Sequence, residues 1–180
     1  MSEYIQTLKE WVRSLRQDIE AVKTVLETEA IGKSGRKFAA AALNYMVTRM
    51  DLVPDWNETI GVIDDTMVMR VCMRLANAYE VGAHLDGDAL LRVSHMSSDV
   101  EHIELILGDE LYSRFRKYCA RLSDTVVRGR SPEHLVSEAD ARAALYRELE
   151  EDLLRMPPAS FDQGEDLTVH LTSYLHHKLT

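Results

Sequence analysis

The chain has 180 residues, of which 46% are hydrophobic and 28% are charged, and its formal net charge is −9. This length and composition are typical of one globular domain with a substantial apolar core. The acidic balance disfavours binding to nucleic acid, and no apolar run is long enough for stable insertion into a membrane. The N-terminus lacks a signal-peptide core and the two cysteines form no recognisable motif, so we expect a soluble, cytoplasmic protein.

The first predicted element is a long amphipathic helix within residues 1–32. Trp11 and Val25 widen its apolar face, which favours a helix that packs on its own chain. A homodimer formed through this helix is the alternative, because a strict heptad spacing is also typical of a coiled coil. The residues that follow this spacing are Ile5, Leu8, Val12, Leu15, Ile19, Val22 and Leu26.

Residues 33–83 are expected to form a central helical hairpin. Its first helix is predicted over 36–50, where four consecutive alanines favour a helix and allow a second helix to approach closely. Its second helix is predicted over 64–81, where apolar residues surround nearly the whole circumference. The few polar residues of that second helix are Arg70, Arg74 and Asn77.

The connector between these helices has strong turn chemistry. Pro54 predicts the first turn of a short helix, and Gly61 predicts the end of that helix. Asp64 and Asp65 then occupy the positions expected for the N-cap and first turn of the next helix.

The motif DLVPDW, followed by a glycine and an Asp-Asp pair and preceded by a tyrosine, resembles the YkvA-like family, a family of unknown function. The match covers residues 36–76, and the resemblance implies a helical hairpin without an assigned activity. Polar residues stand at 57–59, where the family is usually apolar, which indicates that this chain is not among the relatives that look membrane-associated. The matching residues are Tyr45, Asp51, Leu52, Pro54, Asp55, Gly61, Asp64 and Asp65.

The acidic residues of the motif allow two interpretations. Clustered carboxylates are the ligands that hard cations prefer, so a metal-dependent hydrolase is one hypothesis. We favour the other, in which these carboxylates cap helices and pair with Arg49, Arg70 or Arg74. The metal ligands under the first hypothesis would be Asp51, Asp55, Asp64, Asp65 and His84.

After the hairpin, residues 84–158 are expected to supply further helices of the same bundle, and residues 159–180 a linker and a C-terminal helix. A capping box at Ser98 predicts a helix start, and Gly108 predicts a kink or a division of the helix that follows. A second capping signal at Ser137 predicts the start of another helix. Cys72 lies in an apolar pattern and is expected to pack as a small hydrophobic residue.

The sequence therefore predicts an all-α bundle of about six to eight helices around a central hairpin. We expect no cofactor and, more readily than an enzyme, a non-enzymatic protein-interaction or scaffold module whose protein partner is unknown. A large aromatic residue surrounded by polar residues is a typical interface anchor. The candidate interaction residues in the connector are Trp56, Asn57 and Glu58.

Overall fold

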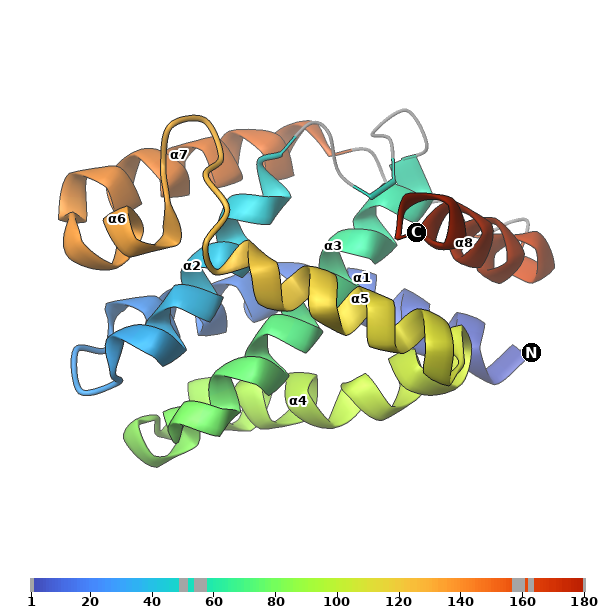
Figure 1. The fold of residues 1–180 in the computed structure, drawn as a ribbon, viewed down its shortest axis with the longest axis horizontal. Helices are drawn as coiled ribbons and strands as arrows, with labels where there is room; N and C mark the ends of the chain where they lie inside the picture. The colour runs from blue at the N-terminus through green and yellow to red at the C-terminus, as the bar shows by residue number, and fades with distance from the viewer. Residues whose placement is uncertain (1, 49–51, 54–57, 157–160, 162–163, 180) are drawn as a thin grey trace.

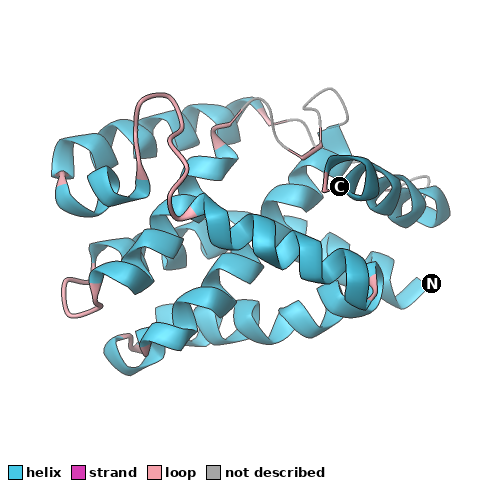
Figure 2. Cartoon of the chain, in the orientation of Figure 1, coloured by secondary structure: helices cyan, strands magenta, loops and turns pink. Residues whose placement is uncertain are grey.

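The computed structural model of the chain describes residues 2–48, 52–53, 58–156, 161 and 164–179. Within these residues the protein consists of helices joined by loops and contains no β-strand, which confirms the predicted all-α bundle (Figure 2). The helices are α1 (Ser2–Glu27), α2 (Lys33–Met46), α3 (Glu58–Ala76), α4 (Gly87–Leu107), α5 (Asp109–Leu122), α6 (Pro132–Ser137), α7 (Ala139–Arg155) and α8 (Gly164–Lys178). Two short 3₁₀ turns, η1 (Asn77–Tyr79) and η2 (Val81–His84), connect α3 to α4.

Helix α3 lies at the centre of the bundle and contacts α1, α2, α4, α5 and α8 (Figure 1). Every residue from Val62 to Met73 is buried. A helix that is apolar on all sides avoids water only when other helices surround it, so the composition of α3 places it in the core. Three methionines of this helix, Met67, Met69 and Met73, are fully buried and fill that core.

Helix α1 packs on α2, α3 and α4 within the same chain. The heptad residues Leu8, Leu15, Ile19, Val22 and Leu26 are each at most 3% exposed. The apolar face of α1 is therefore used inside the bundle, as the broad face of the helix predicted. None of the helices in the described ranges is both long and apolar enough to cross a membrane.

The prediction that a helix begins at Asp64 is wrong, because α3 begins at Glu58 and continues through Gly61. Glycine within a helix costs about 1 kcal/mol relative to alanine. Burial of the neighbouring Ile60 and Ile63 outweighs this cost, since each buried aliphatic side chain contributes about 1.5–3 kcal/mol. Asp64 and Asp65 therefore lie inside the helix and do not cap it.

Of two further predicted helix starts, the one at Ser98 does not occur, whereas the helix predicted to begin at Ser137 is α7, which begins at Ala139 with Glu138 as its N-cap. Ser98 lies inside α4, where its hydroxyl donates to the carbonyl of Ser94 at 3.1 Å instead of capping a new helix. Ser137 ends the short helix α6, which the sequence had not predicted. The hydroxyl of Ser131 caps α6 by accepting from the His134 amide at 3.0 Å, with Pro132 in the first turn.

The predicted division at Gly108 is confirmed. Helix α4 ends at Leu107, and Gly108 adopts a left-handed φ of 72° before α5 begins. Only glycine adopts this region without steric cost, so this residue fixes the corner between the two helices.

Alanine substitutions at two helical glycines are expected to have opposite effects. A Cβ at Gly35 would lie 2.9 Å from Val81 Cγ2 and 3.1 Å from Ile31 Cγ2, whereas a Cβ at Gly61 would meet no atom of the described residues within 4 Å. We expect Gly35→Ala to lower the free energy of unfolding by about 1–3 kcal/mol through overpacking. We expect Gly61→Ala to raise it by about 0.5–1 kcal/mol, because alanine favours the helix. Urea unfolding of both variants tests this pair, and equal effects would contradict it.

Candidate functional site

The tyrosine of the motif and the first residue of its Asp-Asp pair are hydrogen-bonded to each other in the core. The hydroxyl of Tyr45 on α2 donates a short hydrogen bond to Oδ2 of Asp64 on α3. The same hydroxyl accepts a hydrogen bond from the backbone amide of Leu52 at 3.1 Å. Tyr45 therefore ties both helices of the hairpin to the start of their connector.

Burial gives Asp64 unusual electrostatics. Its side chain is 0% exposed, and burial raises the pKa of its carboxyl from 3.8 to about 7. The hydrogen bond from Tyr45 and, to a smaller extent, the backbone amide of Val53 favour the charged form and oppose this rise in the pKa. The other oxygen, Oδ1, makes no hydrogen bond of ordinary geometry with the described residues. Asp64 is therefore expected to change protonation near neutral pH.

The other motif residues divide into two groups. Leu52 and Val53 are buried, and Gly61 lies within α3. Helix α3 begins at Glu58, whose side chain lies outside the described part of the structure. The remaining predicted site residues lie outside the described residues: Asp51, Pro54, Asp55, Trp56 and Asn57.

The structure does not bring His84 to the described acidic residues. Asp64 lies about 18 Å along α3 from the end of the helix at Ala76, and His84 follows that end as an exposed residue. Asp65 is buried next to Asp64, but adjacent helical residues point about 100° apart. Among the described residues, no three His, Cys, Asp or Glu side chains are grouped closely enough to hold a metal ion.

Because the helix start predicted at Ser98 does not occur, two histidines on either side of it, His95 and His102, belong to one helix. Both lie on α4 and are exposed, so they share one face of that helix. Seven residues of helix separate them by about 10.5 Å along the axis, which is too far for both to bind one metal ion directly.

The predicted pairing of Arg70 with motif carboxylates is wrong, because acidic residues from other helices pair with it. Arg70 is 2% exposed and bonds Asp18 of α1 at 3.2 Å and Asp99 of α4 at 2.9 Å. Its guanidinium also lies 4.5 Å from the ring centroid of Trp11 and donates to the carbonyl of Thr66. This network joins α1, α3 and α4 through one side chain.

Asp18 has further partners in this network. It accepts hydrogen bonds from Ser14 at 2.8 Å and from Arg92 at 3.0 Å. Burial lowers the pKa of Arg70, while Asp18 and Asp99 act in the opposite direction and favour the charged guanidinium. The sequence signal for this network was an arginine within an otherwise buried helix, but nothing in the spacing of the chain identified its partners.

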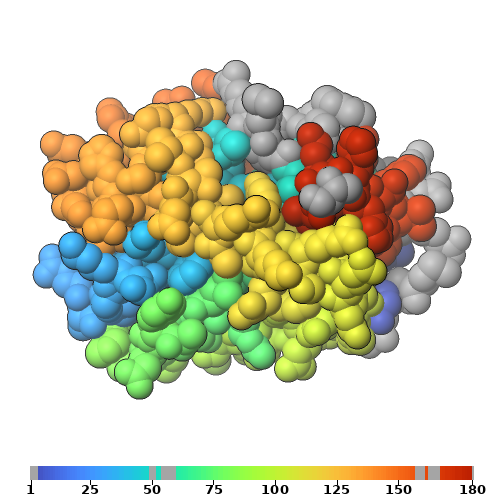
Figure 3. Space-filling view, viewed as in Figure 1, coloured from blue at the N-terminus to red at the C-terminus, as the bar shows by residue number. Residues whose placement is uncertain are grey.

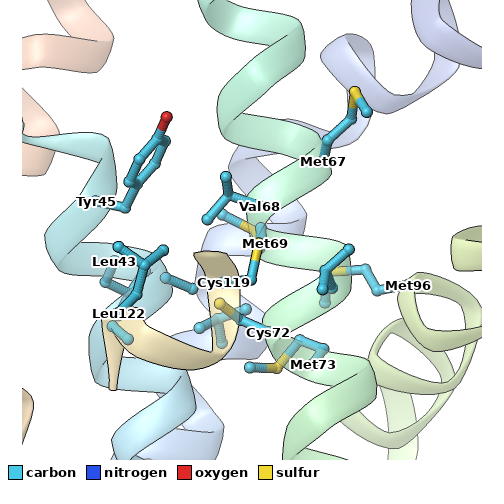
Figure 4. Close-up of a cluster of buried hydrophobic side chains, with 14 of the residues drawn as sticks. Leu43, Tyr45, Met67, Val68, Met69, Cys72, Met73, Met96, Cys119 and Leu122 are labelled. Atoms are coloured by element: carbon cyan, nitrogen blue, oxygen red, sulfur yellow. The ribbon is translucent and has the colours of Figure 1, made fainter. Parts of the chain in front are cut away.

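The two cysteines lie in one cluster of buried side chains. Figure 4 shows Cys72 on α3 and Cys119 on α5 within this cluster, among Leu43, Met69 and Leu122. Both are free thiols and 0% exposed, which confirms the prediction that Cys72 packs as a small hydrophobic residue. Burial raises the pKa of the Cys119 thiol well above its usual range, and the neighbouring Cys72 adds to this rise. The thiol form of Cys119 is therefore strongly favoured.

Comparison of the chain with family models, curated proteins and solved structures gave no match.

Proposed function

We propose that this protein is a non-enzymatic helical module that acts in the cytoplasm, and that the connector of its hairpin binds a protein partner. The proposal includes membership of the YkvA-like family, which rests on the motif residues between Tyr45 and Asp65. In this proposal Trp56 is the anchor of the interface, with Asn57 and Glu58 beside it. The hairpin serves as a rigid support for the connector.

One observation carries the proposal: the two motif groups best suited to chemistry are bonded to each other. Tyr45 donates to Asp64 and accepts from Leu52, so these groups hold the beginning of the connector against the two helices. Asp64 is also 0% exposed, which keeps its carboxyl away from any substrate in solution. Both features favour a role in shaping the connector over a role in a reaction.

The alternative of a metal-dependent hydrolase has a direct test. If Asp64 were a metal ligand, purified protein without a tag would contain stoichiometric manganese, iron or magnesium. The Asp64→Ala variant would lose that metal while it kept its far-UV circular dichroism spectrum. This result would replace the proposal, because it would show that Asp64 holds an ion and does not serve only to shape the connector.

A homodimer through α1 is a weaker candidate. The heptad face of α1 is buried against its own chain, so it offers little apolar surface to a second copy. Sedimentation equilibrium tests for a dimer. If the mass is dimeric, if the exposed substitution Gln6→Lys leaves it unchanged, and if a change on the buried face abolishes it only together with folding, the interface lies away from α1.

The role of Trp56 is tested by photo-crosslinking. A photoreactive amino acid in place of Asn57 is expected to give discrete protein adducts in a cell extract, and a further Trp56→Ala change is expected to remove them. Ser173, an exposed residue of α8, is the matched position for the same photoreactive amino acid. Identical adducts at both positions, or adducts that persist without Trp56, would contradict the proposed interface.

A further inference from the structure

A cavity of about 430 Å³ lies between α2, α5 and the segment that follows α5. This volume is within the range typical of small-molecule sites, which is about 300–1,000 Å³. The cavity is lined mainly by apolar groups, including Ala41 and Leu122, and by the rings of Tyr45 and Tyr118. The two rings meet edge to face, with centroids 6.3 Å apart and planes at 83°. The interior is therefore apolar and partly aromatic.

Residues 125–128 form the outer wall of the cavity, and hydrogen bonds within the turn and to α7 hold them in place. Val127 and Arg130 exchange two backbone hydrogen bonds of 2.9 Å, and Arg128 between them adopts a left-handed φ of 48°. Glu148 of α7 accepts from Arg128 at 2.8 Å and from Arg130 at 2.6 Å. Figure 3 shows this segment, after α5 in the chain, beside α5 on the viewed face. Because these bonds hold the turn, the wall is preformed and little ordering is needed on binding.

The polar groups of the lining set the chemistry of a ligand. The hydroxyl of Thr48 donates to the carbonyl of Asn44 at 3.1 Å, and that of Thr125 donates to the carbonyl of Arg121 at 3.0 Å. Their hydrogens are committed to the backbone, so their lone pairs face a ligand as acceptors.

Asn44 and Arg128 complete the polar lining of the cavity. The Asn44 amide donates to the carbonyl of Arg130 at 3.0 Å, and its Oδ1 makes no hydrogen bond with the described residues. Because this oxygen is itself buried, the hydroxyls of Thr48 and Thr125 are the acceptors that a ligand reaches, while the charge of Arg128 is already paired with Glu148.

We propose that this cavity binds a small, uncharged, aromatic molecule that carries one N–H or O–H donor. An unpaired charge on the ligand would lose its hydration and find no free counter-charge among the described residues of the lining. A donor on the ligand meets the acceptors of Thr48 and Thr125, and its ring packs against Tyr45 and Tyr118. This inference is independent of the proposed protein interface.

The fluorescent amine N-phenyl-1-naphthylamine is a suitable probe, because it is neutral, aromatic and has a single N–H. Titration of the full chain is expected to give saturable binding of one probe per protein. The N-methylated probe lacks the donor and is expected to bind roughly five- to tenfold more weakly, as the loss of one neutral hydrogen bond implies. Equal affinity for both probes would overturn the proposed ligand class.

Two charge substitutions locate the site. Val126 lines the cavity and is 61% exposed, whereas Val169 on α8 is 63% exposed and lies outside the cavity lining. Val126→Glu places a carboxylate in the apolar lining and is expected to weaken probe binding at least about tenfold, whereas Val169→Glu leaves it within about twofold. Both sites are exposed, so neither change should disturb folding. Equal effects of the two substitutions, or binding that does not saturate, would overturn the site.

Discussion

Replacing Arg70 with alanine is expected to lower the free energy of unfolding by about 3–5 kcal/mol, as the loss of one partner in a buried ion pair does. The substitution leaves Asp18 with only Ser14 and the half-exposed Arg92 as partners. It also removes the guanidinium from the ring of Trp11 and leaves a void among three helices. Urea unfolding followed by circular dichroism measures the change.

Arg74 provides the matched control, since it lies one turn further along α3. It is exposed and makes a single side-chain hydrogen bond, to the carbonyl of Ser97 at 3.1 Å. Arg74→Ala is expected to cost less than about 1 kcal/mol. If both arginine variants lose equal stability, the network around Arg70 does not hold α1, α3 and α4 together.

A double variant separates two causes of the lost stability, which are the buried charge without its partner and the lost packing. Arg70→Met removes the guanidinium while it keeps much of the side-chain volume. Asp18→Leu then removes the buried carboxylate that has lost Arg70 as its partner. We expect the double variant to recover about 1–4 kcal/mol relative to Arg70→Met alone. No recovery would mean that the cost arises from packing and not from the buried charge.

The second large expected effect is that the free energy of unfolding depends on pH because Asp64 titrates in the folded protein. The folded-state pKa of about 7 lies above the ordinary value of 3.8, so the folded protein binds a proton at Asp64 more tightly than the unfolded chain. The stability that Asp64 contributes is therefore fully present below the ordinary pKa and is lost as the pH rises through about 7. The difference between the folded and ordinary pKa values of Asp64 corresponds to a loss of unfolding free energy on the order of 4 kcal/mol over this pH range.

The Asp64→Asn variant removes this ionisation. At about pH 5 we expect the variant to be about 1–2 kcal/mol less stable than the wild type, because the amide fits the bond with Tyr45 less well. Between about pH 5 and about pH 8 we expect the variant to gain about 2–3 kcal/mol of stability relative to the wild type, since only the wild type must bury a charge above its folded-state pKa. The difference in unfolding free energy between the two proteins, measured across this range, cancels the contributions of other groups.

Tyr45→Phe tests how the hydrogen bond from Tyr45 affects the raised pKa of Asp64. It removes a hydrogen bond that favours the charged carboxylate, so the pKa of Asp64 should rise further and the loss of stability should extend to higher pH. A difference between Asp64→Asn and the wild type that stays constant from about pH 5 to about pH 8 would show that this carboxyl does not titrate there.

Several elements could be predicted because their signals are local. The heptad spacing of α1 and the alanine run of α2 specify helices in nearly any context. Gly108 specified a boundary, since its left-handed backbone is open to glycine alone. The capping signal at Ser137 indicated the start of α7 to within two residues. The capping signal at Ser98 failed because such a signal is worth only about 1 kcal/mol. Burial of a continuous apolar face outweighs that amount in α4, where the helix passes through Ser98.

The amino-acid sequence by itself determined that this protein is an all-α bundle, that α1 turns its apolar face inward, and that α3 is its core helix. These features follow from apolar periodicity, which depends only on the order of residues along the chain. The tertiary structure alone decided that Tyr45 binds Asp64, that Arg70 binds Asp18 and Asp99, and that α2 and α5 enclose a cavity. Those partners come from different helices, and the choice among many possible partners is made by packing, which no local pattern records.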